Sequence, residues 1–241
     1  MKEQLQKDFD NTVKNLNLSQ KDIEIKKFSL DNFLNKGFPN RKEEDWKFSD
    51  LNQIIKKNIG ELSFFNDYTS TNKVDTSVFV DGLEHNKIVF INGRIEKIDF
   101  DYEKKEQIEI IDQSETINKF DNNNSLSDLN NALTNKSFKI VIKKGYQLLK
   151  PLIIYHTTNS KIWSKNINLR LDFELEEDSS LRLIDLFNDT SEKNFFNIFY
   201  DFNLKENAIL KNYKVDKQEN KNIKYSFNNI EQNKNTISET F

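Results

Sequence analysis

Cysteine is absent from the 241 residues, so the chain can form no disulfide bond and offers no thiolate nucleophile or metal ligand. Its five glycines stand far apart, and neither of the glycine-rich patterns that cradle phosphate groups can be written from them. No apolar run approaches the roughly 18 residues of a membrane helix, and the N-terminal sequence is not that of a signal peptide. We therefore expect a cytoplasmic protein that does not bind membranes.

A strong charge of one sign is also missing. The chain has 36 basic and 39 acidic residues, and its formal net charge of -3 gives no general attraction to nucleic acid. Its lysine pairs alternate with acidic residues and form no basic face with aromatic platforms, so we expect no nucleic-acid partner. Hydrophobic residues make up only 36% of the sequence, but 20 phenylalanines predict a folded protein, because disordered chains are poor in aromatic residues.

The N-terminal segment predicts two helices. The first has an apolar residue at every third or fourth position on a charged background. These positions are Leu5, Phe9, Val13 and Leu16. A second, short helix is predicted over residues 29–36, with Ser29 as its N-cap and with Gly37 and Pro39 ending it.

A third helix is predicted directly after Trp46, from a row of apolar residues at helical spacing. The apolar positions of this row are Phe48, Leu51, Ile55 and Ile59. Arg41 and Glu44 are three residues apart, a spacing at which they could pair on a helix. Trp46 could dock a partner or pack between the helices and the β part; we favour packing, because tryptophan buries a large area.

A β-hairpin is the clearest local signal in the middle of the chain. Asn92 and Gly93 stand between two strand-like runs, and both residue types tolerate the positive φ of a type I′ turn. A further strand is expected over residues 108–111. A helix is expected over residues 126–133, because Ser125 and Asp128 resemble a capping box ahead of a leucine stripe.

From residue 138 onward nearly every segment has the pattern of a strand, with polar turns between. A weak repeat places Leu175, Leu204 and Ile230 at equivalent positions, about 29 and 26 residues apart. No helical period intervenes, which excludes a doubly wound α/β fold. A β-solenoid and a sandwich with long hairpins explain this pattern equally well. The alternating phenylalanines of residues 195–202 suit a solenoid interior or a subunit interface.

These patterns divide the chain into three regions: residues 1–60 are helical, residues 61–137 form a mixed α/β connection, and residues 138–241 are rich in strands. The two histidines are His85 and His156, and we expect neither to bind a metal, because no second histidine stands at ligand spacing. The carboxylate runs at residues 43–45 and 176–178 are expected to be solvated, because neighbouring residues on a strand point to opposite faces.

Residues 37–51, GFPNRKEEDWKFSDL, resemble the N-terminal signature of the SufD family. The residues that carry this resemblance are Pro39, Arg41, Glu44, Trp46, Lys47 and Phe48. Further family-like stretches follow in matching order: VFINGRI, LNNALTNKSFKIVIKKG with KPLIIYHTT, and RLDFELEEDSSLRLID with LKENAILKNYKV. The resemblance extends from about residue 28 to the end of the sequence.

This resemblance implies a mainly β protein with an N-terminal α-helical region and a right-handed parallel β-helix core. SufD-like proteins are non-catalytic scaffold subunits of the SufBCD iron–sulfur cluster assembly complex. They pair with SufB and are coupled to the SufC ATPase, so SufB-like and SufC-like subunits are the expected partners. The cluster belongs to the whole complex; we expect this chain to bind no cofactor and to carry no catalytic or metal-binding residue, and the family motif to be structural or partner-docking.

Family members are longer than this chain, which ends at Phe241 inside the repeating strand region. We therefore expect an apparently truncated β-helix with incomplete coils, and a reading frame that continues in SufD-like sequence. Three alternatives remain: a SufB-like paralogue, a β-solenoid enzyme that acts on carbohydrate, and a structural solenoid without an assembly role. The enzyme would need acidic or basic side chains that cluster on one exposed face of the solenoid.

Overall fold

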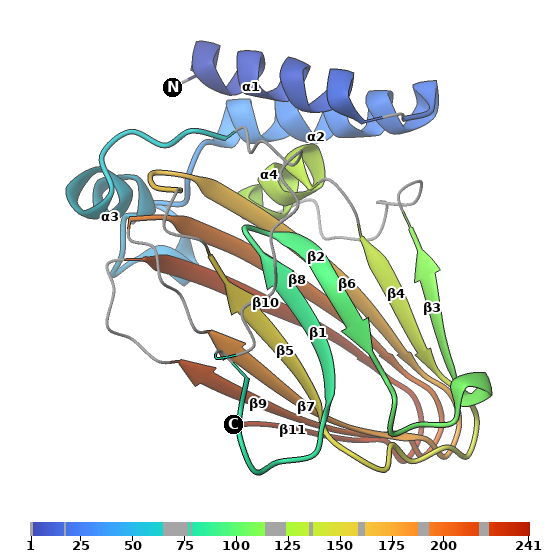
Figure 1. Ribbon diagram of the computed structural model, residues 1–241. Coiled ribbons are helices and arrows are strands. Elements are labelled where there is room, and N and C mark those ends of the chain that lie inside the picture. The colour runs from blue at the N-terminus through green and yellow to red at the C-terminus, as the bar shows by residue number, and fades with distance from the viewer. Residues whose placement is uncertain are drawn as a thin grey trace.

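The computed structural model describes residues 2–16, 18–64, 77, 79–113, 124–134, 137–158, 162–187, 193–216 and 222–241. The described part is mainly β, with an N-terminal helical region and a β-solenoid of about three turns (Figure 1). Both features agree with the fold expected from the sequence. The parallel strand pairing of successive coils rules out the sandwich with long hairpins.

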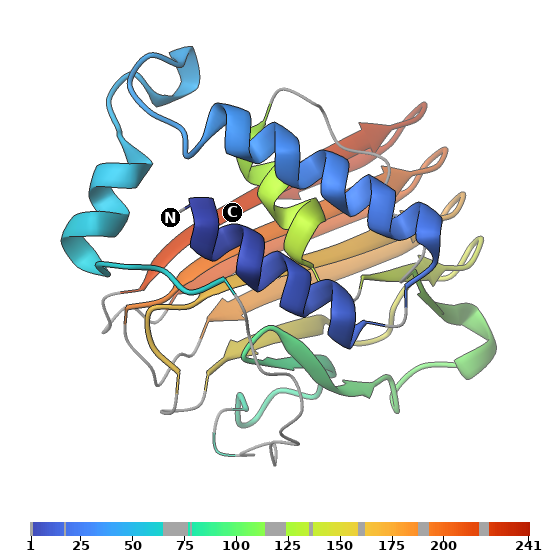
Figure 2. The same cartoon turned by 90° about the horizontal axis from the view of Figure 1, so that it is seen from above.

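Within the described ranges, the helical part contains four α-helices. They are α1 (Lys2–Asn15), α2 (Gln20–Lys36), α3 (Leu51–Asn58) and α4 (Ser125–Leu133). The predicted first helix is present, and Leu5 and Phe9 of its apolar stripe are buried. In Figure 2, α1 and α2 run side by side across the strands, with α4 between them and the sheet.

The second helix is longer than predicted. It starts at Gln20, because Ser19 and not Ser29 is its N-cap and accepts a hydrogen bond from the backbone N–H of Asp22. Ser29 lies inside the helix and is buried. The predicted end is correct: Gly37 adopts a φ of 76° and its N–H bonds to the carbonyl of Phe33.

The third and fourth helices also begin elsewhere than the sequence indicated. Phe48 was placed on the apolar stripe of the third helix, but it precedes α3 and is 85% exposed. Asp50 caps α3 by accepting from the N–H of Gln53. Asn124, not Ser125, caps α4, because its side-chain oxygen accepts from two backbone N–H groups of the first turn.

The strands form two sheets that face each other. The first has the order β11-β9-β7-β5-β1-β2 and the second the order β10-β8-β6-β4-β3. Within the described residues, β1 pairs with β2 and β3 with β4 in antiparallel fashion, and every other neighbouring pair in these two orders is parallel. The strands of the first sheet are β1 (Asn86–Ile91), β2 (Arg94–Asp99), β5 (Leu152–Thr157), β7 (Ser180–Phe187), β9 (Ile209–Asp216) and β11 (Ile237–Thr240). Those of the second are β3 (Ile108–Asp112), β4 (Phe138–Ile142), β6 (Asn166–Leu175), β8 (Phe195–Leu204) and β10 (Ile223–Gln232).

The predicted hairpin joins β1 to β2. Asn92 and Gly93 have φ values of 52° and 82°, as a type I′ turn requires. A Cβ atom at Gly93 would also lie 2.6 Å from Cγ2 of Ile167, so glycine is required for space as well as for backbone conformation. The turn therefore packs directly against β6.

The structure confirms the repeat of Leu175 and Leu204, but Ile230 is not its third member. Leu175 pairs with Leu204, as expected, and Leu204 pairs with Gln232; Ile230 instead pairs with Phe202. The turns that follow these strands repeat too. They place Asp178, Asn207 and Asn235 at φ values of 58°, 61° and 58°. Such short polar side chains tolerate the left-handed region, and this explains the polar turns of the sequence.

The hydrophobic core fills the space between the two sheets, where side chains of one coil stack on those of the next. The interior becomes more polar in the coil that contains β10. Leu169 and Ile198 are apolar, but Ser226 takes the next position in that row. Leu171 and Tyr200 are likewise followed by Asn228. A second apolar cluster lies outside the solenoid, between the helices and the outer face of β8.

Candidate functional site

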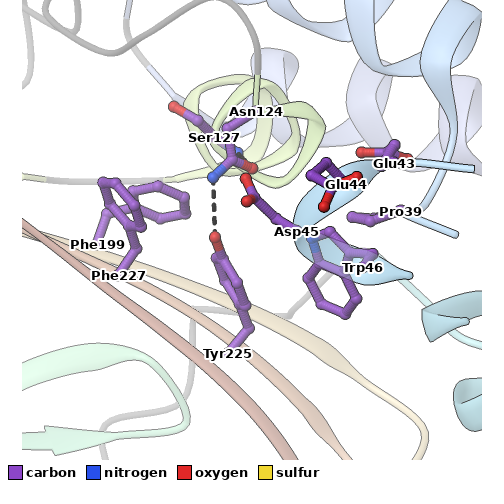
Figure 3. A pocket seen from close by; sticks show the side chains of 10 residues that line it. All are labelled: Pro39, Glu43, Glu44, Asp45, Trp46, Asn124, Ser127, Phe199, Tyr225 and Phe227. Atoms are coloured by element: carbon purple, nitrogen blue, oxygen red, sulfur yellow. Dashed lines mark hydrogen bonds between the residues drawn. The ribbon is translucent and has the colours of Figure 1, made fainter. Parts of the chain in front are cut away.

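The pocket that three of the six family-like motif residues line lies where the helical region meets the solenoid wall. It is bounded by the loop after α2, by the first turn of α4 and by the outer faces of β8 and β10 (Figure 3). Its volume is about 640 Å³. The lining residues are Pro39, Glu43, Glu44, Asp45, Trp46, Asn124, Ser127, Phe199, Tyr225 and Phe227.

Backbone hydrogen bonds hold the motif loop in shape. The carbonyl of Pro39 accepts from the N–H of Leu51 at 3.1 Å, so the two ends of the loop are tied together. Within the loop, residues Glu44–Trp46 form one turn of 3₁₀ helix. The N–H of Ser49 then bonds to the carbonyl of Trp46 at 2.7 Å. The loop thereby presents three consecutive carboxylates and then an indole.

Aromatic rings form the sheet side of the pocket. The Trp46 ring centroid lies 5.9 Å from that of Tyr225, with an interplanar angle of 31°. Phe199 packs on Tyr225 and on Phe227, with centroid distances of 5.9 Å and 5.4 Å. Trp46 is half-buried, and it packs against the cluster between the helices and the solenoid. The structure thus places it at the junction of the two parts.

The hydroxyl of Tyr225 is tied to α4. It accepts a hydrogen bond of 2.8 Å from Nδ2 of Asn124, whose Oδ1 caps that helix (Figure 3). Burial raises the pKa of Tyr225, and the negative charge of Asp45 raises it further, whereas the Asn124 hydrogen bond lowers it. The hydroxyl therefore keeps its proton at neutral pH, because its pKa lies above the ordinary tyrosine value of 10.

The three carboxylates differ in their partners. Glu43 accepts from the N–H of Asn40 at 3.1 Å, and Glu44 accepts from Nζ of Lys47 at 3.1 Å. Among the residues that the structure describes, the Asp45 carboxylate has no hydrogen bond or ion pair of its own. Asp45 is therefore the acidic group most available to a ligand.

The structure brings half of the motif residues into the pocket. Pro39, Glu44 and Trp46 line it, whereas Lys47 and Phe48 do not. Glu44 pairs with Lys47 and not with Arg41, because residues 41–43 form a turn and not a helix. The Glu44 and Lys47 side chains are 86% and 53% exposed, so this pair contributes only about 0–1 kcal/mol.

Sequence reasoning missed the sheet side of the pocket. The phenylalanines around β8 were expected in a solenoid interior or a subunit interface, and their positions are divided. Phe196 and Phe202 point inward, but Phe195 and Phe199 pack under the helices on the outer face. The alternation along β8 was a usable signal for two faces, but nothing in the sequence indicated that helices cover the second face.

The two histidines lie away from this pocket. His156 is inside the solenoid, where its Nε2 lies 2.6 Å from Oδ1 of Asp185 and 2.9 Å from the hydroxyl of Tyr200. His85 lies beside Tyr155, with 2.7 Å between its Nε2 and the hydroxyl. Within the described ranges, no group of three or more histidine, aspartate or glutamate side chains could hold a metal ion.

Comparisons with known proteins give no family assignment. Neither a scan against protein-family models nor a search of curated proteins finds a match to this chain. In the part of the chain that the structure describes, no helix is long and apolar enough to cross a membrane.

Proposed function

We propose that this chain is a non-catalytic scaffold subunit of a SufBCD-type iron–sulfur cluster assembly complex, equivalent to the N-terminal portion of SufD. The observation that supports this best is the combination of a β-solenoid with an N-terminal helical region, joined at the motif loop that resembles the SufD signature. The fold expected from that resemblance and the described fold agree.

The proposed mechanism is architectural. The coils of the solenoid from β5 to β9 provide a rigid body for pairing with a SufB-like subunit, because in-register ladders and an apolar core connect them. Movements of a SufC-like ATPase would be transmitted through the complex. The iron–sulfur cluster is the cargo of the assembled complex and not a resident group of this chain.

The arrangement of acidic residues favours the scaffold over a carbohydrate-acting solenoid enzyme. Such an enzyme needs carboxylates that converge and remain available for proton transfer. The carboxylates near the turns after β4 and β6 instead face lysines. These pairs are Lys139–Glu174, Lys143–Glu176 and Lys144–Glu177.

The test is reconstitution of a complex. The full-length gene product is co-expressed with the SufB-like and SufC-like subunits of the same genome, and the affinity-purified material is passed over a size-exclusion column. We expect one species that contains all three subunits at micromolar concentration. Co-expression with either partner alone is the control. The scaffold assignment is wrong if the three proteins elute separately at that concentration.

A competition version of this reconstitution, with a SufD-like subunit of the same genome added, decides the SufB-like alternative. A SufB-like paralogue would take the place of SufB, so it would bind a SufD-like subunit of the genome and compete with SufB for it. We expect no such competition.

A further inference from the structure

We propose that the pocket at the motif loop binds an arginine side chain presented by a partner protein. This inference goes beyond the scaffold function and does not depend on the identity of the partners. It rests on three features of the pocket: its charge, its aromatic faces and its open rim.

The charge of the lining favours a cation. Glu43, Glu44 and Asp45 line the pocket, and none of the described lining residues is basic. Lys47 pairs with Glu44 from outside the pocket, and among the described residues the other two carboxylates have no cation. In Figure 3 the Asp45 carboxylate points toward Asn124, over the space in front of Tyr225. An incoming cation would therefore meet Asp45 first.

The aromatic faces favour the same kind of ligand. The face of an aromatic ring carries negative potential and attracts a cation that lies within about 6 Å of its centre. Trp46 and Tyr225 stand next to the carboxylates and are inclined by only 31°. A cation in front of these rings would be stabilised by both the π-systems and the acidic side chains.

Arginine fits this combination better than lysine or a compact ammonium ion. The guanidinium group is planar, so it can stack flat on a ring while its N–H groups donate to a carboxylate in the same plane. The pocket offers a ring and a free carboxylate from adjacent residues, Trp46 and Asp45. A lysine ammonium would make the charge contact without the stacking.

The size and exposure of the pocket favour a protein as the source. A volume of about 640 Å³ exceeds the space that one guanidinium fills, and the Glu44 side chain at the rim is 86% exposed. A partner that inserts one side chain would fill the remaining space with neighbouring residues. The pocket walls are also preorganised, because Asn130 of α4 donates to the backbone carbonyls of Leu169 and Asn197 at 3.0 Å and 2.7 Å.

Tryptophan fluorescence provides a direct test. The chain has two tryptophans, and Trp163 is 67% exposed and does not line the pocket, so Trp163→Phe leaves Trp46 as the single reporter. This full-length variant is titrated with acetyl-Gly-Arg-Gly-amide at low ionic strength. We expect a saturable change in Trp46 emission, with a dissociation constant in the range of roughly 0.1–5 mM.

Matched ligands and variants identify what is bound. The citrulline tripeptide has the same shape without the charge and should bind about tenfold more weakly, as should the arginine tripeptide to Asp45→Asn. Asp31→Asn removes an exposed carboxylate of α2 and should leave binding unchanged. Circular dichroism and the thermal midpoint establish that each variant is folded, and calorimetric titration repeats the measurement without the reporter.

Each opposite result overturns part of the proposal. Absence of a saturable emission change at peptide concentrations up to roughly 50 mM, or equal binding of the citrulline peptide, rejects a cation site. Equal binding of the lysine tripeptide rejects selectivity for arginine. Equal binding of free ethylguanidinium rejects a protein partner in favour of a small cation. None of these results affects the test of complex formation, so this proposal and the scaffold function can fail separately.

Discussion

At the scale of single residues, the solenoid interior holds a buried polar group. His156 is stacked between Phe90 and Phe187, with centroid distances of 5.4 Å and 4.2 Å, and it shares Oδ1 of Asp185 with the hydroxyl of Tyr200. Burial raises the pKa of Tyr200 well above its usual value, and the nearby charge of Asp185 raises it further. Asp185 is therefore the common acceptor for two buried donors.

Replacement of Asp185 by alanine should strongly destabilise the fold. The change leaves His156 and Tyr200 without their acceptor inside the core, and each buried polar group left without a partner costs roughly 1–3 kcal/mol. Urea unfolding measures the loss. Glu239→Ala is the control: this glutamate pairs with Lys211, and the two side chains are 43% and 44% exposed, so its loss should cost about 1 kcal/mol or less. Similar losses for the two variants would contradict this reasoning.

Lys26 gives a pH-dependent prediction. Its Nζ is buried and donates to the carbonyls of Asn131 and Thr134 at 3.0 Å and 2.7 Å, near the end of α4. Burial lowers its pKa from 10.5 to about 7; Arg170 lowers it further, and Asp22 opposes both effects. Between pH 7 and pH 10.5 the unfolded chain holds a proton that the folded chain has released, so the free energy of unfolding rises with pH across this window.

The measurement compares wild type with Lys26→Met in urea from pH 6 to pH 10. The unfolding free energy of wild type minus that of Lys26→Met should rise as the pH increases above 7 and should be constant below it. Lys27→Met, at the exposed neighbouring position, should follow wild type at every pH. Parallel curves for wild type and Lys26→Met would show that Lys26 keeps its proton in the folded state.

At the scale of elements, the β1–β2 hairpin depends on Gly93. Gly93→Ala puts a side chain at positive φ and also forces Cβ against Ile167, so we expect a loss of roughly 2–4 kcal/mol. Gly82→Ala is the control: its φ is 73°, but no heavy atom lies within 4 Å of the added Cβ. Only the backbone term remains there, about 1 kcal/mol. Thermal or urea unfolding distinguishes the two, and equal losses would exclude the steric term.

The hairpin also illustrates which elements the sequence could predict. Asn92 and Gly93 specify their turn locally, whereas a helix start depends on which of several polar residues the tertiary structure selects. Ser19 and Asn124 are as suitable for capping as Ser29 and Ser125, so residue type alone does not decide where these helices begin. Phe48 fitted a helical spacing, but the chain there forms a loop that the Pro39–Leu51 hydrogen bond closes.

Of the pocket at the motif loop, only the loop side could be predicted from the sequence. The motif loop is a continuous stretch of sequence, but Tyr225 and Asn124 reach Trp46 through the stacking of coils and the docking of α4. Strand register decides such contacts, and the weak repeat was compatible with a sandwich as well as a solenoid. The misplaced Ile230 shows the same limit, because an error of two residues in register leaves the apolar alternation intact.

At the scale of the whole molecule, the stacked coils differ in what holds each to the next. The inward rows that are apolar through β6 and β8 continue into β10 as Ser226 and Asn228, which accept hydrogen bonds of 2.7 Å and 3.3 Å from Nζ of Lys214. Burial lowers the pKa of Lys214, and Asp185 opposes this effect. The last coil therefore gains less free energy from apolar burial than the coils before it.

This difference in the interior predicts that the solenoid does not open as one unit. The coil that contains β10 and β11 should detach and re-form while β6 and β8 remain intact, so its amide protons should exchange with deuterium at a lower opening free energy. Native-state hydrogen exchange followed by mass spectrometry measures this strand by strand. Equal protection from β6 to β10 would show that the coils unfold together in spite of the polar interior. The polar side chains of β10 thus predict a boundary within the solenoid, between a stable body and a coil that opens separately.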